Sequence, residues 1–201
     1  MENETLVFAT SNVGKLKEIR EMLEPLGYHI LSLDDVHLKV EHPEDSETYE
    51  GNSRIKAEDI AARCDYPVIA DDSGLSIEAL NGFPGVHSAR FLEGHPYSEK
   101  NRAILEMMKN IKDRRASYFT VVTYIDKKKG VEVSFPGENK GEIVASVDEH
   151  PINGFGYDPI FYSYDVKKTF SQTKPEEKDA ISHRGRAIRQ LVEYLKQHEG
   201  E

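Results

Sequence analysis

The feature that most constrains the fold is an early change of hydrophobic period, from strand to helix and back to strand. Residues Thr5 to Thr10 form a short apolar run rich in strand formers, and apolar residues then recur at intervals of three and four until Gly27. The following segment, Tyr28 to Leu33, has the composition of a second strand. A strand, a tight loop, a helix and another strand in succession indicate a sheet that packs against helices.

The rest of the chain mixes helices with strands that form hairpins. Helical spacing extends over Thr48 to Arg63, and Ser98 can cap a helix that ends at about Lys109. Apolar positions from Ile181 to Leu195 predict a C-terminal helix. The predicted strands are 67–70, 116–126, 131–135, 141–147 and 160–162. This mixture implies an α/β or α+β fold with a mixed sheet, and no composition break divides residues 1–201 into separate domains.

The net charge excludes several classes of partner. The chain has 26 Lys and Arg against 36 Asp and Glu, a formal charge of −10. Phosphate polymers and anionic lipid surfaces repel such a protein, so we expect neither a nucleic-acid polymer nor a membrane as partner. A single cysteine, Cys64, an acidic N-terminus and the lack of a long apolar run predict a cytoplasmic protein.

The first predicted strand ends in a small polar loop, Ala9-Thr10-Ser11-Asn12-Val13-Gly14-Lys15. Backbone N–H groups at a helix start favour an anion, and Lys15 adds a full positive charge there. The segment is not a P-loop, because Leu16 follows Gly14-Lys15 where Ser or Thr is required. An anion site and an ordinary N-cap with a solvated lysine both fit this loop.

An acidic pair, Asp71-Asp72, follows the apolar run Pro67 to Ala70 and precedes Ser73-Gly74. Adjacent carboxylates at the end of a strand point to different sides, so one can hold Mg²⁺ while the other is structural. A carboxylate beside a metal ion can also deprotonate water. The alternative is an Asx turn, which the sequence Asp-Ser-Gly favours.

Two later segments contain residues suited to ligand binding. In Gly154-Phe155-Gly156-Tyr157-Asp158-Pro159 the glycines let the backbone approach a ligand, and Phe155 or Tyr157 could stack on a planar ring. A tight turn with aromatic packing fits this loop equally well. Lys178 and the run Ser182-His183-Arg184-Gly185-Arg186 place basic groups where the last helix begins, suited to phosphate contacts or to solvent.

Taken together, these segments resemble the inosine triphosphate pyrophosphatase family of non-standard purine nucleoside triphosphate pyrophosphatases. The motifs that carry the resemblance are Thr10-Ser11-Asn12-x-x-Lys15-x-x-Glu18, Ala70-Asp71-Asp72-Ser73-Gly74-Leu75, Gly82-Phe83-Pro84-Gly85-Val86 with Ser88-Ala89-Arg90-Phe91, Gly154 to Pro159, and Ser182-His183-Arg184. The resemblance implies Mg²⁺-dependent hydrolysis of ITP, dITP and XTP to the monophosphate and pyrophosphate, which removes these nucleotides from the pool. It also implies a homodimer of α/β chains, each an elongated, two-lobed single domain with a long mixed β-sheet flanked by helices and an active-site cleft between the lobes.

The resemblance further implies a role for each matching position. Asp72 and Lys56 are the expected catalytic residues, with Asp72 as general base. The expected metal ligands are Asp72 and Glu41, and Glu44 is a rival for Glu41 within the same acidic stretch. The expected substrate-binding residues are Thr10, Ser11, Asn12, Val13, Gly14, Lys15, Asn52, Ser73, Phe155, Gly156, Tyr157, Asp158, Lys178, His183 and Arg184.

Two other interpretations of the acidic pair stay open. A metal phosphatase with Asp71 or Asp72 as nucleophile would release orthophosphate as its first product rather than pyrophosphate. A nucleotide-binding module would bind nucleotide with Mg²⁺ but would not hydrolyse it. The substitution Asp72→Asn would then have no catalytic activity to remove. An RNA-binding role is the least compatible with the acidic charge.

Overall fold

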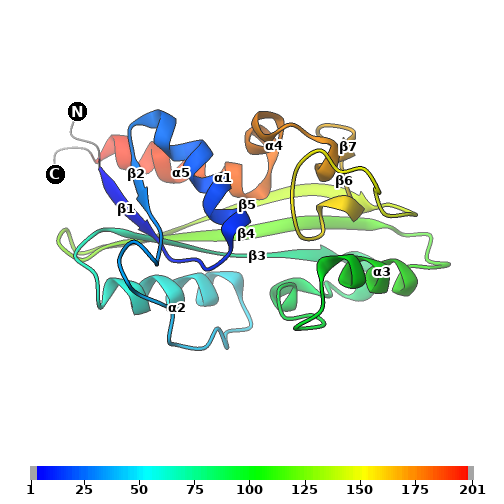
Figure 1. Ribbon diagram of the computed structural model, residues 1–201, viewed down its shortest axis with the longest axis horizontal. Helices are drawn as coiled ribbons and strands as arrows, with labels where there is room; N and C mark the ends of the chain where they lie inside the picture. Colours follow the sequence, from blue (N-terminus) through cyan, green and yellow to red (C-terminus); the bar gives the residue numbers. More distant parts are fainter. Residues whose placement is uncertain (1–3, 199–201) are drawn as a thin grey trace. The chain divides into compact units, whose positions relative to one another are not determined.

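The structure, a computed structural model, describes residues 4–198 and contains a seven-stranded mixed sheet (Figure 1). In spatial order the strands are β2 (His29–Leu31), β1 (Thr5–Phe8), β3 (Val68–Ile77), β4 (Arg115–Asp126), β5 (Val131–Ile143), β6 (Phe161–Ser163) and β7 (Lys168–Thr169). Strand β1 lies parallel to β2 and β3, whereas β6 lies antiparallel to β5 and β7. The predicted mixed sheet of an α/β fold is therefore confirmed.

Helices follow the strands in the order that the hydrophobic spacing predicts. They are α1 (Val13–Leu23), α2 (Tyr49–Ala61), α3 (Tyr97–Met107), α4 (Pro175–Ile181) and α5 (His183–Gln197). Helix α1 continues into a 3-10 turn that ends at Gly27, whose φ of 95° is the left-handed conformation that glycine adopts most easily. Within residues 4–198 no helix has the length and apolar content needed to cross a bilayer.

The chain forms two compact units, each built from separate segments. Among the described residues, unit 1 comprises the chain up to Asp72, then Thr120–Pro136, and the chain from Arg184 onward. Unit 2 comprises Ser73–Phe119 and Gly137–His183. The boundaries between the units fall inside β3, β4 and β5 and after the first residue of α5.

Strand residues of unit 1 alternate between two hydrophobic cores. Leu6 and Phe8 of β1 pack in the core that contains residues of α1 and α5, whereas Val7 and Ala9, the residue directly after β1, pack in the core that contains residues of α2. Figure 1 shows α1 and α5 on one face of the sheet and α2 on the other. Because side chains of a strand point alternately to its two faces, a strand buried on both faces is apolar throughout.

The core of unit 2 is rich in aromatic side chains. Its buried members include Leu75, Ile77, Ile104, Met108, Tyr118, Ile143, Tyr157, Phe161 and Phe170. The ring centroids of Tyr118 and Phe161 are 4.8 Å apart, and those of Phe161 and Phe170 are 5.0 Å apart, both in edge-to-face geometry. Rings in such contact restrict one another's positions, and Tyr157 of this core belongs to the glycine-spaced segment 154–159.

Several predicted element boundaries are wrong. Strand β3 continues through Asp71-Asp72-Ser73-Gly74, so the Asx-turn interpretation of this segment is incorrect. Strand β5 runs through Pro136-Gly137, where the sequence predicts a gap between two strands. Helix α3 begins one residue before Ser98, with Pro96 as its N-cap. The predicted C-terminal helix is α5, but Ile181, which the sequence assigns to it, is the last residue of the separate helix α4.

Candidate functional site

The polar loop between β1 and α1 is an N-cap whose side chains fix its own backbone. Asn12 caps α1 by accepting a hydrogen bond on Oδ1 from the backbone N–H of Lys15 at 3.0 Å. The N–H of Asn12 in turn donates to Thr10 Oγ1 at 3.1 Å. The first N–H groups of a helix have no acceptor within the helix, so the start of α1 favours an anion.

The acidic pair on β3 sends its two carboxylates to opposite faces of the sheet. Asp71 is bound by Lys15 of α1 and Arg184 of α5, while Asp72 is bound by Asn52 of α2. Both carboxylates are buried, Asp72 with 7% of its surface exposed. The sequence prediction that the two carboxylates point to different sides is confirmed.

Asp72 is held by contacts to both its side chain and its backbone. Asn52 donates from Nδ2 to Asp72 Oδ2 at 3.2 Å, and the Lys56 ammonium lies 3.8 Å from Asp72 Oδ1. Thr120 of β4, which is fully buried, donates from Oγ1 to the Asp72 carbonyl oxygen at 3.0 Å. Burial raises the pKa of Asp72 to about 6, although the Lys56 and Lys15 charges act to lower it. A carboxyl with this pKa exchanges its proton near neutral pH.

Glu44, rather than Glu41, shares the surroundings of Asp72. Glu44 Oε2 lies 3.1 Å from Lys56 Nζ, the same ammonium that faces Asp72. Glu41 instead pairs with Arg63 at 3.0 Å. The contacts of Asp72 therefore favour the rival candidate, and the metal-ligand role of Glu41 stays a prediction.

Asn52 connects this acidic segment to Asp72. Its amide accepts from the backbone N–H of Ser46 at 3.0 Å and donates to the Ser46 carbonyl oxygen at 3.0 Å, in addition to its bond to Asp72. Since Ser46 is two residues from Glu44, one buried amide fixes both the segment that carries Glu44 and the Asp72 carboxylate. The substrate-binding role predicted for Asn52 stays a prediction, and these contacts add a structural role.

Arg184 is buried between two carboxylates. Its side chain donates to Asp71 Oδ2 from Nε at 3.2 Å and from Nη2 at 3.1 Å, and Nη1 donates to Glu18. Burial acts to lower the pKa of Arg184, but the Asp71 and Glu18 charges outweigh it and raise the pKa above its ordinary value. The predicted contact of Arg184 with substrate stays a prediction.

Glu18 has a structural role that the sequence analysis does not assign, although it lies one turn after Lys15 on the same predicted helix face. The ammonium of Lys15 lies 3.1 Å from Asp71, and burial lowers the pKa of this lysine while Asp71 acts to raise it. Lys15 and Arg184 thus bind Asp71, and Glu18 binds the same arginine. Burying such a network costs desolvation energy. Removing one member destabilises the protein strongly, because a charge then stays buried without full compensation.

In unit 2 the glycine-spaced loop is organised by Asp158. Asp158 Oδ2 accepts from the Phe155 backbone N–H at 2.8 Å and from Lys178 Nζ at 2.7 Å. The Lys178 ammonium also lies 4.9 Å from the centre of the Phe155 ring. A Cβ on Gly154, which has a φ of 87°, would lie 2.3 Å from Asp158 Oδ2, so glycine is required there. The predicted residues Phe155, Asp158 and Lys178 are in contact.

The two aromatic residues of this loop differ in accessibility. The Tyr157 ring is buried, and its hydroxyl donates to the Ser88 carbonyl oxygen at 2.6 Å. Phe155 is only partly buried. Of the two rings that the sequence offers for stacking on a planar base, the structure therefore favours Phe155.

Two further predicted residues of unit 2 lie outside this loop. The buried His183 ring stacks on the Tyr118 ring, with centroids 4.7 Å apart and an interplanar angle of 8°. Ser73 is partly buried within β3. Their substrate contacts stay predictions.

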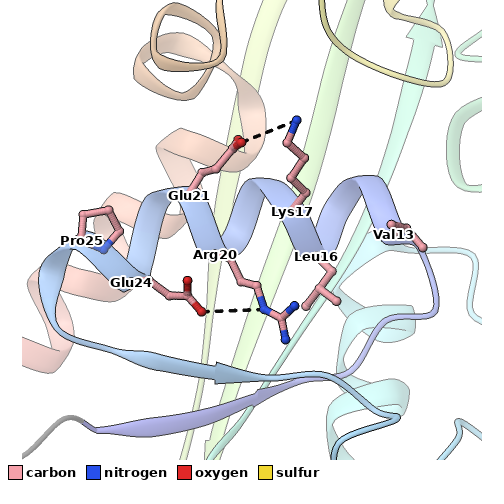
Figure 2. A pocket seen from close by; sticks show the side chains of 7 residues that line it. All are labelled: Val13, Leu16, Lys17, Arg20, Glu21, Glu24 and Pro25. Atoms are coloured by element: carbon pink, nitrogen blue, oxygen red, sulfur yellow. Dashed lines mark ion pairs between the residues drawn. The ribbon is translucent and has the colours of Figure 1, made fainter.

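A hollow of about 410 Å³ lies along α1 (Figure 2), and neither Asp71 nor Asp72 is among the residues that line it. Its lining residues are Val13, Leu16, Lys17, Arg20, Glu21, Glu24 and Pro25. Figure 2 shows that Lys17 pairs with Glu21 and Arg20 with Glu24 along the helix. Val13, with 79% of its surface exposed, is the one predicted site residue among those seven.

No group of three or more His, Cys, Asp or Glu side chains within residues 4–198 is placed to hold a metal ion by itself. Mg²⁺ in phosphate-handling proteins is typically bound through one or two carboxylates together with the phosphates of the substrate. Asp72 and Glu44, which face a common ammonium, are a donor set of that size and chemistry.

Comparisons with known proteins all point to one family. A family model described as the Ham1 family matches residues 6–194. The chain is 39% identical over 199 residues to a dITP/XTP pyrophosphatase of Clostridium perfringens, covering 94% of this chain and 96% of that protein. It is 40% identical over 191 residues to a dITP/XTP pyrophosphatase of Flavobacterium johnsoniae, covering 94% and 97% respectively. The solved structure of the Staphylococcus aureus Ham1 protein matches with a TM-score of 0.84 and 34% identity, covering 98% of this chain and 100% of that one.

Proposed function

This chain belongs to the Ham1 family, and from that premise we propose that it hydrolyses non-standard purine nucleoside triphosphates to the monophosphate and pyrophosphate. The substrates are ITP, dITP and XTP, and the reaction removes them from the nucleotide pool. The names of the relatives from Clostridium perfringens and Flavobacterium johnsoniae support dITP and XTP. Residues 1–201 act as one pyrophosphatase domain.

The observation that carries this proposal is the environment of Asp72. Its carboxylate is buried, oriented by Asn52, faces Lys56, and has a pKa raised to about 6. A general base is most effective when its pKa lies near the working pH. Asp72 accepts the proton of the water molecule that adds across the anhydride between the α and β phosphates, and pyrophosphate leaves.

Mg²⁺ is the metal that this donor set suits. Glu44 and Asp72 would hold it through carboxylate oxygens, with Glu41 as the alternative ligand that the family resemblance implies. When bound, Mg²⁺ neutralises charge on the triphosphate and polarises its phosphorus–oxygen bonds. The ammonium of Lys56 lies within 4 Å of both Glu44 and Asp72. A triphosphate held by Mg²⁺ at these carboxylates would therefore also have its charge neutralised by Lys56.

The loop from Thr10 to Lys15 binds the triphosphate. The N–H groups of Val13 and Gly14 at the start of α1 and the ammonium of Lys15 are donors to phosphate oxygens, and the Asn12 cap, which uses the Lys15 N–H, keeps them in place. The binding residues of this segment are Thr10, Ser11, Asn12, Val13, Gly14 and Lys15.

Residues of unit 2 recognise the base. Phe155 offers a ring face for stacking, and Lys178, held by Asp158, offers hydrogen-bond donors and no acceptor. A 6-keto purine accepts from such donors, whereas the 6-amino group of adenine leaves them unpaired. Asn52, Ser73, Gly156, Tyr157, His183 and Arg184 complete the residues assigned to substrate binding.

The test is pyrophosphate release from a panel of ITP, dITP, XTP, GTP, ATP and pyrimidine triphosphates, with and without Mg²⁺. We expect hydrolysis of ITP, dITP and XTP well above that of ATP and GTP, and loss of hydrolysis when Mg²⁺ is chelated. Orthophosphate as the first product would instead identify a phosphatase. Nucleotide binding without any product would identify a binding module.

The proposal includes a cytoplasmic homodimer, as the family resemblance implies. Light scattering coupled to size-exclusion chromatography measures the mass in solution directly. A mass of one chain across the working concentration range would contradict the dimer.

A further inference from the structure

Helix α3 carries polar residues where its apolar stripe should continue. Ile104 and Met108 face the core of unit 2, and positions 97, 100 and 101 lie on the same side of the helix, one and two turns earlier. Those positions hold Tyr97, Lys100 and Asn101. Lys100 and Asn101 are nevertheless buried, with Asn101 only 2% exposed. A leucine at either position would satisfy the spacing at a lower desolvation cost.

Asn101 uses its amide on the loop that carries Phe155 and Asp158. Its Nδ2 donates to the carbonyl oxygen of Gly156 at 3.1 Å. Its Oδ1 is buried and has no hydrogen-bond partner in the described part of the chain. A buried amide that satisfies only one of its two ends is a poor choice for stability alone, because the unmade hydrogen bond costs free energy.

Other contacts of α3 reach the same loop and its support. The Tyr97 and Tyr157 rings meet edge to face with centroids 5.2 Å apart, and Tyr97 lies beside Gly156. The Lys100 ammonium donates to the Ala89 carbonyl oxygen at 2.8 Å, one residue after the carbonyl that accepts from the Tyr157 hydroxyl. The first half of α3 therefore contacts the loop and its support, through Asn101, Tyr97 and Lys100, in addition to the core.

We propose that Asn101 is a positioning residue for base recognition, which rests on the proposed function of the loop. Gly154 and Gly156 both have positive φ angles, 87° and 66°, and glycines give a loop many alternative conformations. Asp158 fixes the backbone before Gly156 through the Phe155 N–H, and Asn101 fixes the carbonyl of Gly156 itself. With both bonds made, Phe155 and the Asp158–Lys178 pair are presented to the purine in one arrangement. Asn101 acts on the base only through this loop.

The test compares Asn101→Leu and Asn101→Asp with Arg114→Met. Leucine keeps the size of the side chain and removes the donor, and an ionised aspartate cannot donate either. Arg114 is the matched control, because its guanidinium donates to the carbonyls of Met108, Ile143 and Val144 and none of these belongs to the loop. The control therefore weakens unit 2 at the other end of α3.

The measurements are the thermal midpoint, the KM and kcat for dITP and dATP, and the affinities for IMP and AMP by titration calorimetry. For both Asn101 variants we expect KM for dITP to rise about tenfold with kcat changed less than about threefold, and the preference for IMP over AMP to fall about tenfold. Arg114→Met lowers the thermal midpoint and leaves KM and the preference as in the wild type.

The preference for IMP over AMP, measured by calorimetry, tests the positioning role of Asn101 without requiring turnover. A wild type that prefers IMP but releases no pyrophosphate would overturn the proposed function, and the Asn101 variants would still report on the loop. An unchanged IMP preference in both Asn101 variants would overturn the positioning role. It would also be overturned by a wild type that binds IMP and AMP equally, or by an equal loss of preference in Arg114→Met.

Discussion

Arg184 and Asp71 form a buried ion pair between α5 and β3, with Nε and Nη2 of the arginine 3.2 and 3.1 Å from Asp71 Oδ2. The third guanidinium nitrogen of Arg184 donates as well: Nη1 forms a hydrogen bond to the Glu18 carboxylate of α1. The pair connects residues 113 positions apart in the sequence. It joins a strand and two helices of unit 1 at the point where the strand carries Asp72 on its other face.

Replacement of Arg184 by methionine therefore destabilises the protein. The substitution takes the guanidinium away from the buried Asp71 and Glu18 carboxylates and leaves Lys15 beside Asp71. Breaking a buried pair in this way costs about 3–5 kcal/mol. Urea unfolding measures the loss, and Arg189→Met on the exposed side of α5 should stay within about 0.5 kcal/mol of the wild type. Arg184→Met combined with Asp71→Asn and Glu18→Gln should recover part of the stability. A variant with unchanged unfolding and lost activity would instead make Arg184 a substrate contact.

The raised pKa of Asp72 predicts that this residue costs stability at neutral pH. Its pKa is about 6 in the folded protein against an ordinary 3.8, so the folded state binds the proton more tightly. The ionised carboxylate then disfavours folding by up to roughly 3 kcal/mol above pH 6, and the penalty disappears as the pH falls from about 6 to about 4. Without divalent cations, Asp72→Asn should be more stable than the wild type at pH 7.

Unfolding curves of the two proteins from pH 7.5 to pH 4 test this prediction, because the difference between them should shrink over that interval. Asp45→Asn, at an exposed position of the acidic stretch, controls for the loss of one carboxylate. In the same samples Asp72→Asn should lower kcat for dITP by a factor of about 10² or more, as expected for the loss of a general base. A stability difference that does not depend on pH would contradict the raised pKa.

Replacing Glu44 and replacing Glu41 should change the Mg²⁺ dependence of pyrophosphate release differently. Because Glu44 shares Lys56 with Asp72, Glu44→Gln should raise the Mg²⁺ concentration for half-maximal pyrophosphate release roughly 10- to 100-fold. Glu41→Gln removes only an ion pair with Arg63 at the surface and should leave that concentration unchanged. The reverse result would return the metal-ligand role to Glu41.

The hydrophobic period predicts the elements of unit 1 well, because each strand there buries apolar side chains against helices and α1 buries a single apolar stripe. The apolar run of β1, the spacing of α1 and the glycine that ends its final turn each have a local cause. The course of β3 through Asp71-Asp72-Ser73-Gly74 has no such cause. Local chemistry favours a turn there, whereas in the structure β3 is hydrogen-bonded between β1 and β4. Lys15 and Arg184, 56 and 113 residues away in the sequence, bind the Asp71 carboxylate.

The site shows the same division between local and distant causes. The capped start of α1 and the glycine loop are recognisable in the sequence, since each depends on neighbouring residues. The contacts of Glu18, Glu44 and Asn101 depend on which segments the fold brings together. Their sequence signals are weak. Glu18 lies one helical turn after Lys15, and Glu44 is one of several acidic residues in a polar stretch. Asn101 is a polar residue at an apolar position of its helix.

The last prediction concerns Gly154, which the loop of unit 2 requires for two separate reasons. Alanine there would adopt a left-handed conformation, at a cost of about 1–2 kcal/mol, and its Cβ would lie 2.3 Å from Asp158 Oδ2. The displaced carboxylate would lose its bonds to the Phe155 N–H and to Lys178. Gly154→Ala should therefore be less stable than the wild type by more than the backbone cost alone, with a raised KM for dITP.

Gly130→Ala is the matched control for this variant. Gly130 has a comparable φ of 67° in the turn between β4 and β5, and a Cβ there would meet no atom within 4 Å. It should show the backbone cost of about 1–2 kcal/mol in urea unfolding and an unchanged KM. Equal losses of stability in the two variants, with KM unchanged in both, would mean that the Asp158 carboxylate moves aside freely and that its bond to the Phe155 N–H does not set the loop. The difference between the two alanine variants thus isolates the contribution of the Asp158 carboxylate from that of backbone strain.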